Sequence, residues 1–217
     1  MKPQNTPLGI NAVVGFAVAV ILLASGVLGV DALMHSGASV PHTISKQEIK
    51  DLRYMREEEK LARDVYMFLA DRWGLPAFQR IAQAEQRHTD AIAALLDRYH
   101  IPDPARDKAP GVFVDAGLSA LYAELVAKGS QSLDQALWVG GLIEEVDIHD
   151  LDKALANTQL LDISQVYQQI QAGSRNHLRA FVSNLENRGT PYRAQKLSPD
   201  RVRVIVTGPM ERGPLFF

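Results

Sequence analysis

The sequence predicts an all-α protein: a four-helix bundle with a long crossover between its second and third helices, preceded by an N-terminal apolar helix. Three observations support this prediction. Four long segments carry apolar residues at helical spacing. Residues typical of helix ends bound these segments. The first two segments are closely joined and so are the last two, whereas the stretch between the pairs, "IPDPARDKAPG", holds three prolines.

The N-terminal segment from Gly9 to Val30 carries no charged residue and is about as long as the ~20 residues that cross a bilayer. Lys2 precedes it and Asp31 follows it. We therefore expect residues 1–31 to form an uncleaved single-pass anchor in the cell membrane, with the bundle outside the cytoplasm. The alternative is a cleaved signal peptide, which makes the protein secreted or periplasmic.

Residues 32–44 are small and polar and predict a linker to the bundle, which spans residues 45–189. Ser45 and Glu48 stand at capping-box spacing and start the first helix. Gly74 ends that helix. Pro76 suits the first turn of the second helix, which runs to about His100.

The crossover and the third helix follow. "LSALYAELVAKG" predicts a short helix within the crossover. The third long helix begins at Ser132, with Gln135 at capping-box spacing.

The fourth helix begins at Asp162, with Gln165 in the same relation, and ends at Gly189. Beyond it, residues 190–217 leave the helical pattern. "RVRVIVTG" alternates apolar and polar residues as a strand does. We expect this tail to be extended or disordered.

Composition excludes several functions. The 217 residues carry a net charge of −2 with no basic stripe, which argues against a nucleic-acid partner. The chain has no cysteine, so disulfides, thiolate metal sites and cysteine nucleophiles are excluded. A metal site must therefore use His, Asp and Glu, a donor set that suits iron, manganese or zinc.

The first two helices carry polar residues beside their apolar stripes. Glu85 and His88, in "IAQAEQRHTDAIAALL", are three residues apart and so share one face of the second helix. In the first helix, Glu59 and Tyr66 lie on one stripe, whereas Glu57 and Glu58 are better placed to face solvent. Each feature alone has an ordinary structural explanation, a solvated charge at the margin of the core.

The third and fourth helices add to the set. Glu144 and Asp147 are three residues apart in the third helix, and His177 lies in the fourth. Four carboxylates and two imidazoles then face the interior, where unpaired charges are costly. Two divalent ions remove that cost, which predicts a site for two iron or manganese ions. A purely structural polar core is the alternative.

These residues lie in motifs that resemble a known family. "EEEKLARDVY", "FQRIAQAEQRH", "ALWVGGLIEEVDIHDL" and "GSRNHLRAF" resemble a prokaryotic ferritin-like family catalogued as domain of unknown function 2202. The resemblance runs from about Leu52 to Leu185, and the family is similar in fold to rubrerythrins and ferritins.

The resemblance implies a role for each matched residue. Glu59 and Tyr66 match the first-helix ligand and its nearby tyrosine, and Glu85 and His88 match the Glu-x-x-His motif of the second helix. Glu144 and Asp147 resemble the third-helix carboxylates. The fourth helix departs from the pattern, because Ser174 stands where a second Glu-x-x-His motif ending at His177 has its glutamate.

Three functions fit these features. The first is a di-iron oxidoreductase that reduces peroxide or dioxygen or oxidises ferrous iron, with Tyr66 donating a hydrogen bond or an electron. The second is a non-catalytic metal-binding or sensing module at the membrane. The third is a structural or interaction bundle without metal, which Ser174 favours. Ferritin-like bundles often pair, which leaves a homodimer open.

Overall fold

The computed structural model describes residues 43–212. Within that range it consists of six α-helices and no strand. The helices are α1 (Lys46–Trp73), α2 (Pro76–Arg98), α3 (Ala116–Gly129), α4 (Leu133–Asn157), α5 (Leu161–Glu186) and α6 (Pro199–Thr207). None of these helices is both long and apolar enough to cross a membrane. The predicted anchor at residues 1–31 lies outside the described range.

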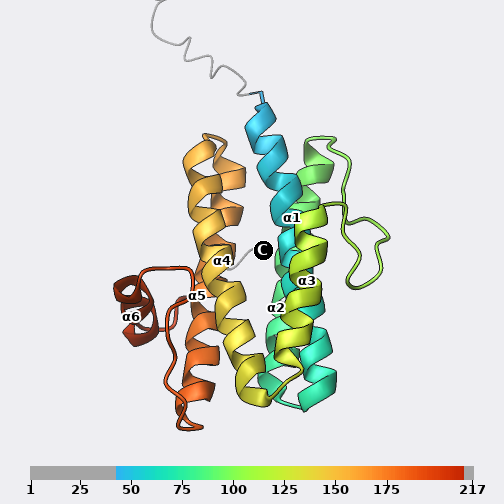
Figure 1. The fold of residues 1–217 in the computed structure, drawn as a ribbon. Helices are drawn as coiled ribbons and strands as arrows, with labels where there is room; N and C mark the ends of the chain where they lie inside the picture. The colour runs from blue at the N-terminus through green and yellow to red at the C-terminus, as the bar shows by residue number, and fades with distance from the viewer. Residues whose placement is uncertain (1–42, 213–217) are drawn as a thin grey trace, which may run out of the picture. The chain divides into compact units, whose positions relative to one another are not determined.

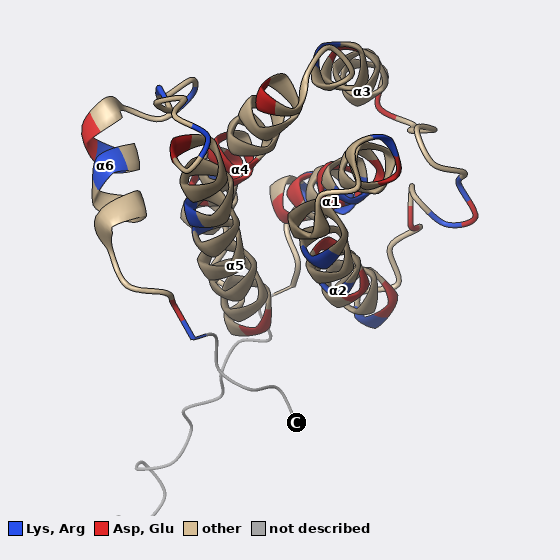
Figure 2. Ribbon diagram, turned by 90° about the horizontal axis from the view of Figure 1, so that it is seen from below, with Lys and Arg blue, Asp and Glu red and all other residues tan. Residues whose placement is uncertain are grey.

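The four long helices form a bundle of two hairpins (Figure 1). Helix α1 packs along α2, and α4 packs along α5. The hairpins meet where α1 contacts α4 and where α2 contacts α5. The predicted all-helical bundle is thus confirmed, with the crossover between α2 and α4. Its short helix, α3, packs on α1 and α4, while α6 lies against the outside of α5 (Figures 1 and 2).

Two apolar clusters fill the bundle, one towards each end. One cluster is built from side chains such as Val65, Leu69, Phe78, Leu137 and Phe181. The other contains Leu52, Met55, Ile92, Leu96 and Tyr167. In every long helix, a stretch of five to ten residues separates the residues of the two clusters. The predicted ligands lie in those stretches, so they form a polar layer between two apolar ones.

The helix ends follow local rules in the first hairpin. Ser45 and Glu48 form the predicted capping box. Gly74 ends α1 in the left-handed conformation, at φ 66°, which glycine adopts without strain. Pro76 occupies the first turn of α2.

The start of α5 differs from the prediction. This helix begins at Leu161 with Leu160 as its N-cap and without a side-chain cap. Asp162 instead accepts hydrogen bonds from Arg98 at 2.8 Å and from the Tyr99 hydroxyl at 2.9 Å. This long-range contact therefore replaces the predicted capping box.

The prediction of an extended tail was wrong for residues 199–207, which form α6. Ser198 caps this helix and Pro199 occupies its first turn. Val202 and Ile205, three residues apart, are buried against α5, with Leu178 and Val182 in the same cluster. Tertiary packing therefore outweighs the strand-like alternation and the weak helix propensity of β-branched residues.

The placement of Glu57 and Glu58 in solvent was also wrong, since each is only 4% exposed. The Glu57 carboxylate accepts hydrogen bonds from the backbone N–H groups of Val114 and Asp115, at the start of α3. Helix α3 covers this side of α1, which a bundle of four helices alone leaves open.

Candidate metal centre

The polar layer at mid-bundle receives side chains from all four long helices. Glu59 comes from α1, Glu85 and His88 come from α2, Glu144 comes from α4 and His177 comes from α5. The three carboxylate residues are each 2% exposed. The histidine side chains retain 15% and 12% exposure. The layer is therefore closed to bulk water except at its histidine edge.

Five of these side chains form two groups of three that share one residue. Glu59, Glu85 and His88 make the first group, and Glu85, Glu144 and His177 make the second. In each group the ligand atoms lie within 4.8 Å of one another. Glu85 is therefore the one carboxylate common to both groups.

Glu85 divides its two oxygens between the two histidines. Its Oε2 lies 2.7 Å from Nδ1 of His88, and its Oε1 lies 2.8 Å from Nδ1 of His177. Nδ1 of His88 also lies 3.3 Å from Glu59 Oε2, and Nδ1 of His177 lies 3.5 Å from Glu144 Oε2. Despite its close contact with Glu85, Nδ1 of His177 has no partner in hydrogen-bond geometry among the residues that the structure describes.

Tyr66 holds the carboxylate of Glu144, a member of the second group, through a hydrogen bond. Its hydroxyl donates to Glu144 Oε1 over 2.6 Å and lies 3.3 Å from the carbonyl oxygen of Gly140. Burial, followed by the charge of Glu144, raises the pKa of Tyr66 well above its ordinary value. The phenol therefore stays protonated and acts as a donor.

Burial and mutual charge perturb the acids of the layer in different directions. Burial raises the pKa of Glu59 to about 8, although His88 opposes the shift. Burial likewise raises the pKa of Glu144. Burial also acts upward on the pKa of Glu85, but the positive charges of His177 and His88 outweigh it and hold that pKa below the ordinary value.

The neighbouring carboxylates also shift the pKa values of the two histidines. Burial lowers the pKa of His177, but Glu85 and Glu144 outweigh it and raise that pKa to about 10. In the same way, Glu85 and Glu59 raise the pKa of His88 well above its ordinary value. Without a metal, two imidazolium groups supply the positive charge of the layer.

Asp147 lies beside the five residues but belongs to neither group of three. Its Oδ2 accepts a hydrogen bond from the Ser174 hydroxyl, and its Oδ1 has no hydrogen-bond partner within residues 43–212. Burial raises the pKa of Asp147 well above its ordinary value, and the charge of Glu59 adds to the shift.

Several buried oxygens of this region lack a hydrogen-bond partner in the part of the chain that the structure describes. They are Oε1 of Glu59, Oδ1 of Asp147 and both carboxyl oxygens of Glu58. Such atoms are rare in folded proteins because each lost hydrogen bond costs about 1–3 kcal/mol. Carboxylate oxygens and imidazole nitrogens are also the donors that iron, manganese and zinc accept. The residues present therefore fit a metal pair.

The absence of a side chain at Gly173 leaves room for the His88 ring next to α5. A Cβ added at this glycine lies 2.7 Å from Nε2 and 2.8 Å from Cε1 of His88. Gly173→Ala should therefore push the ring from its position between Glu59 and Glu85 and weaken metal binding about 10- to 100-fold. Isothermal titration with Mn²⁺ measures this loss.

A neutral change on the same helix is the control for Gly173→Ala. Ser183 is exposed on α5, so Ser183→Ala should bind metal as the wild type does. Alanine also favours a helix over glycine by about 1 kcal/mol. The expected result is thus weaker binding without a matching loss of fold. Equal affinity in both variants contradicts the packing role of Gly173.

The sequence motifs identified most of the layer. The structure brings Glu59, Glu85, His88, Glu144 and His177 together and sets Asp147 and Tyr66 beside them. The sequence analysis missed the burial of Glu58, for which a run of three glutamates gave no signal.

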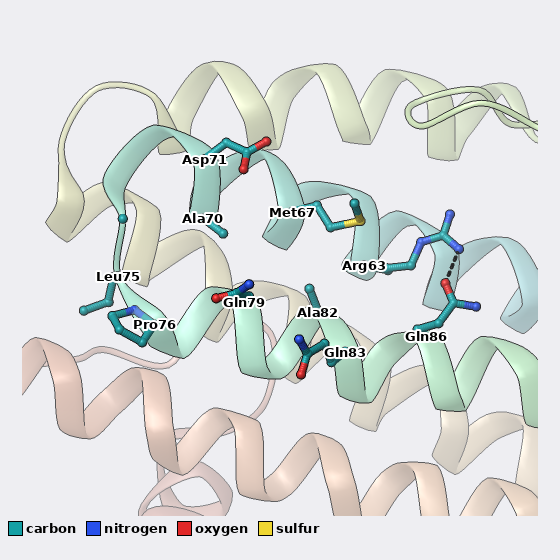
Figure 3. A pocket seen from close by; sticks show the side chains of 11 residues that line it. Arg63, Met67, Ala70, Asp71, Leu75, Pro76, Gln79, Ala82, Gln83 and Gln86 are labelled. Carbon is teal, nitrogen blue, oxygen red and sulfur yellow. Dashed lines mark hydrogen bonds between the residues drawn. The ribbon is translucent and has the colours of Figure 1, made fainter.

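A separate hollow of about 480 Å³ lies between α1 and α2, near the turn that joins them (Figure 3). Met67, Gln79 and Gln83 are among its lining residues. At one end, Arg63 donates to Gln86 over 2.7 Å. This hollow contains none of the predicted ligands.

Comparison with known proteins identifies the family and supports the fold. Residues 48–209 match the model of the family described as "Uncharacterized protein domain (DUF2202)". The chain is 46% identical over 170 residues to "Uncharacterized protein MJ0754" of Methanocaldococcus jannaschii. The aligned region covers 78% of this chain and 92% of that protein. A crystal structure of hypothetical protein MJ0754 from Methanococcus jannaschii DSM 2661 superposes with a TM-score of 0.76. It covers 77% of this chain and 96% of that one.

Proposed function

The chain belongs to the DUF2202 family, and we propose that it is a ferritin-like protein whose bundle binds two ions of iron or manganese. One ion is assigned to Glu59, Glu85 and His88, and the other to Glu85, Glu144 and His177. The observation that carries this proposal is the position of Glu85, which faces both histidines from the centre of the layer.

The surroundings of the layer favour redox chemistry over simple structural use of the metal. When bound, a pair of iron ions supplies the electrons for reduction of peroxide or dioxygen, or accepts them from ferrous iron. The protein orients Glu144 through the Tyr66 hydroxyl. Apolar clusters on both sides exclude water, and the part-exposed edges of His88 and His177 leave the layer accessible from one side. The apolar segment at residues 9–30 leads us to propose further that the bundle is held at the membrane, outside the cytoplasm.

Metal stoichiometry tests the proposal. The full chain, purified in detergent without a histidine tag, is stripped with chelator and reloaded anaerobically with ferrous iron or Mn²⁺. Elemental analysis should give two ions per chain. With ascorbate added as the electron donor that returns the iron to the ferrous state, peroxide should then oxidise the loaded iron, followed optically, over repeated turnovers. Two ions without turnover identify a binding module, and no bound ion rejects the proposal.

Raising the pH from about 6.5 to about 10 should destabilise the metal-free protein. The folded-state pKa of His177, about 10, lies above its ordinary value of 6.5. Its charged form contributes stability that is fully present below pH 6.5 and is lost as the pH rises through about 10. Glu59 acts in the same direction up to its raised pKa of about 8, because the folded protein keeps a proton that the unfolded chain has released. Glu85 contributes nothing in this range, since its lowered pKa leaves it ionised in both states.

Bound metal should oppose this loss of stability at high pH, because metal ions compete with the same protons for the side chains of the layer. Urea unfolding at pH 6.5, 8 and 9.5, with chelator or with Mn²⁺, measures both effects. Stability with chelator should fall across the series, and the stabilisation by Mn²⁺ should grow. A stability with chelator that rises with pH contradicts the assigned charges.

A further inference from the structure

Helix α5 lacks one carboxylate that a two-metal bundle is expected to have. Such bundles take a glutamate from each of two helices and a Glu-x-x-His motif from each of the other two. Helices α1, α2 and α4 satisfy this pattern with Glu59, with Glu85 and His88, and with Glu144. In α5, Ser174 precedes His177 by three residues, so the serine occupies the position of the glutamate.

The same position is in contact with an additional carboxylate from α4. Asp147 follows Glu144 by three residues and therefore projects from the same face of that helix. Ser174 is 1% exposed, and its hydroxyl contacts both Asp147 Oδ2 and the carbonyl oxygen of Ile170. The contact joins the two helices at the level of the polar layer.

The second carboxyl oxygen of Asp147, Oδ1, indicates the role of the contact between Asp147 and Ser174. Asp147 is 6% exposed, and its Oδ1 has no hydrogen-bond partner among the described residues. A carboxylate buried this deeply keeps its charge only when that charge is compensated. Oε1 of Glu59, from the first group of three, is likewise buried and unpaired. A bound cation would give both of these unpaired oxygens a partner.

We propose that the carboxylate missing from α5 has moved to α4: Asp147 is a metal ligand through Oδ1, and Ser174 is the positioning residue that holds Oδ2. This inference rests on the proposed two-metal function. It accounts for the departure of α5 from the expected motif without loss of a metal ion.

An exchange of the two side chains tests the inference. Asp147→Ser removes the carboxylate, and Ser174→Glu restores one at the position that the motif expects. The double variant Asp147→Ser/Ser174→Glu adds a single methylene to the combined volume, so the site remains close to its original size. Ser174→Ala removes only the positioning contact, and Asp147→Asn keeps the shape of the side chain. Asp152→Asn is the control, since Asp152 is an α4 aspartate that pairs with Arg201 at the surface.

The affinity and number of Mn²⁺ ions bound by the full chain are measured for each variant, with circular dichroism to verify folding. Asp147→Ser and Asp147→Asn should each bind fewer ions or bind them at least about 10-fold more weakly, and Ser174→Ala should lose about 10- to 100-fold. The double variant should recover affinity relative to Asp147→Ser.

Three results overturn the inference, and they are distinguishable. If the wild type binds two ions and Asp147→Asn binds them equally well, Asp147 is no ligand and the proposed function still stands. If the wild type binds none, the proposed function fails and the inference fails with it. A double variant that folds but binds no better than Asp147→Ser also contradicts the transfer of the carboxylate from α5 to α4.

Discussion

Glu85→Gln should abolish binding of both metal ions, whereas Glu59→Gln and Glu144→Gln should each weaken one site. Glu85 is the shared member of the two ligand groups, and the other two glutamates each belong to one. Glutamine keeps the shape of the side chain but removes its charge. Changing a residue that merely supports a ligand costs about 10- to 100-fold in affinity, so loss of the shared ligand should exceed about 100-fold. Elemental analysis after anaerobic loading measures the number of ions retained.

A glutamate outside the layer provides the control for these three variants. Glu124 is exposed on α3, so Glu124→Gln should retain both ions. The prediction fails if Glu85→Gln retains one ion at wild-type affinity, because the two sites are then independent. It also fails if Glu59→Gln loses both ions while remaining folded.

Asp64→Ala should lower the free energy of unfolding by about 3–5 kcal/mol. Asp64 and Lys60 form a buried ion pair of 2.5 Å, with side-chain exposures of 0% and 2%. Asp64 also accepts a hydrogen bond from the backbone N–H of Gly111, and Lys60 donates to the carbonyl oxygen of Ala109. Removing the carboxylate leaves the ammonium group of Lys60 buried without its counter-charge, takes away the partner of the Arg63 guanidinium and breaks the hydrogen bond from Gly111 in the crossover. Guanidinium unfolding of the metal-free protein, followed by circular dichroism, measures the loss.

Two further variants separate the buried charge from the general effect of mutation. Arg203 and Asp200 form an exposed pair on α6, so Arg203→Ala should leave the unfolding midpoint unchanged. Lys60→Met/Asp64→Leu removes both buried charges and should be more stable than Asp64→Ala. An Asp64→Ala protein as stable as Arg203→Ala contradicts a structural role for the buried pair.

The sequence could predict those features that depend on neighbours along the chain. The helical spacing of Glu85 and His88 placed both on one face, and the glycine at position 74 ended the first helix as expected. Glu59, Glu144 and His177 were found because helices of a bundle bring residues at equivalent depth together. The periodicity of each helix was sufficient for that inference.

Features that depend on contacts between distant segments were not predictable in this way. Asp147 and Ser174 are 27 residues apart, and nothing local to either residue indicates their hydrogen bond. Glu57 is buried because the start of α3 covers this side of α1, where the backbone N–H groups of Val114 and Asp115 donate to its carboxylate. Helix α6 likewise depends on the surface of α5, where Val202 and Ile205 find an apolar partner.

The segment before α6 shows the same dependence on distant contacts. Glu145, on α4, accepts backbone hydrogen bonds from Gln195, Lys196 and Leu197 at 2.6–3.0 Å, and one from the Tyr192 hydroxyl at 2.6 Å. A glutamate next to a predicted ligand thus fixes the polypeptide beyond the bundle. Its role becomes visible only once the fold places the two segments side by side.

Anomalous diffraction from crystals loaded with Mn²⁺ is the most direct test of the shared site. We expect two anomalous peaks per chain, one on each side of the Glu85 carboxylate, with His88 beside one peak and His177 beside the other. A single peak that does not touch Glu85, or fully loaded crystals with no peak in the polar layer, contradicts the two-metal centre.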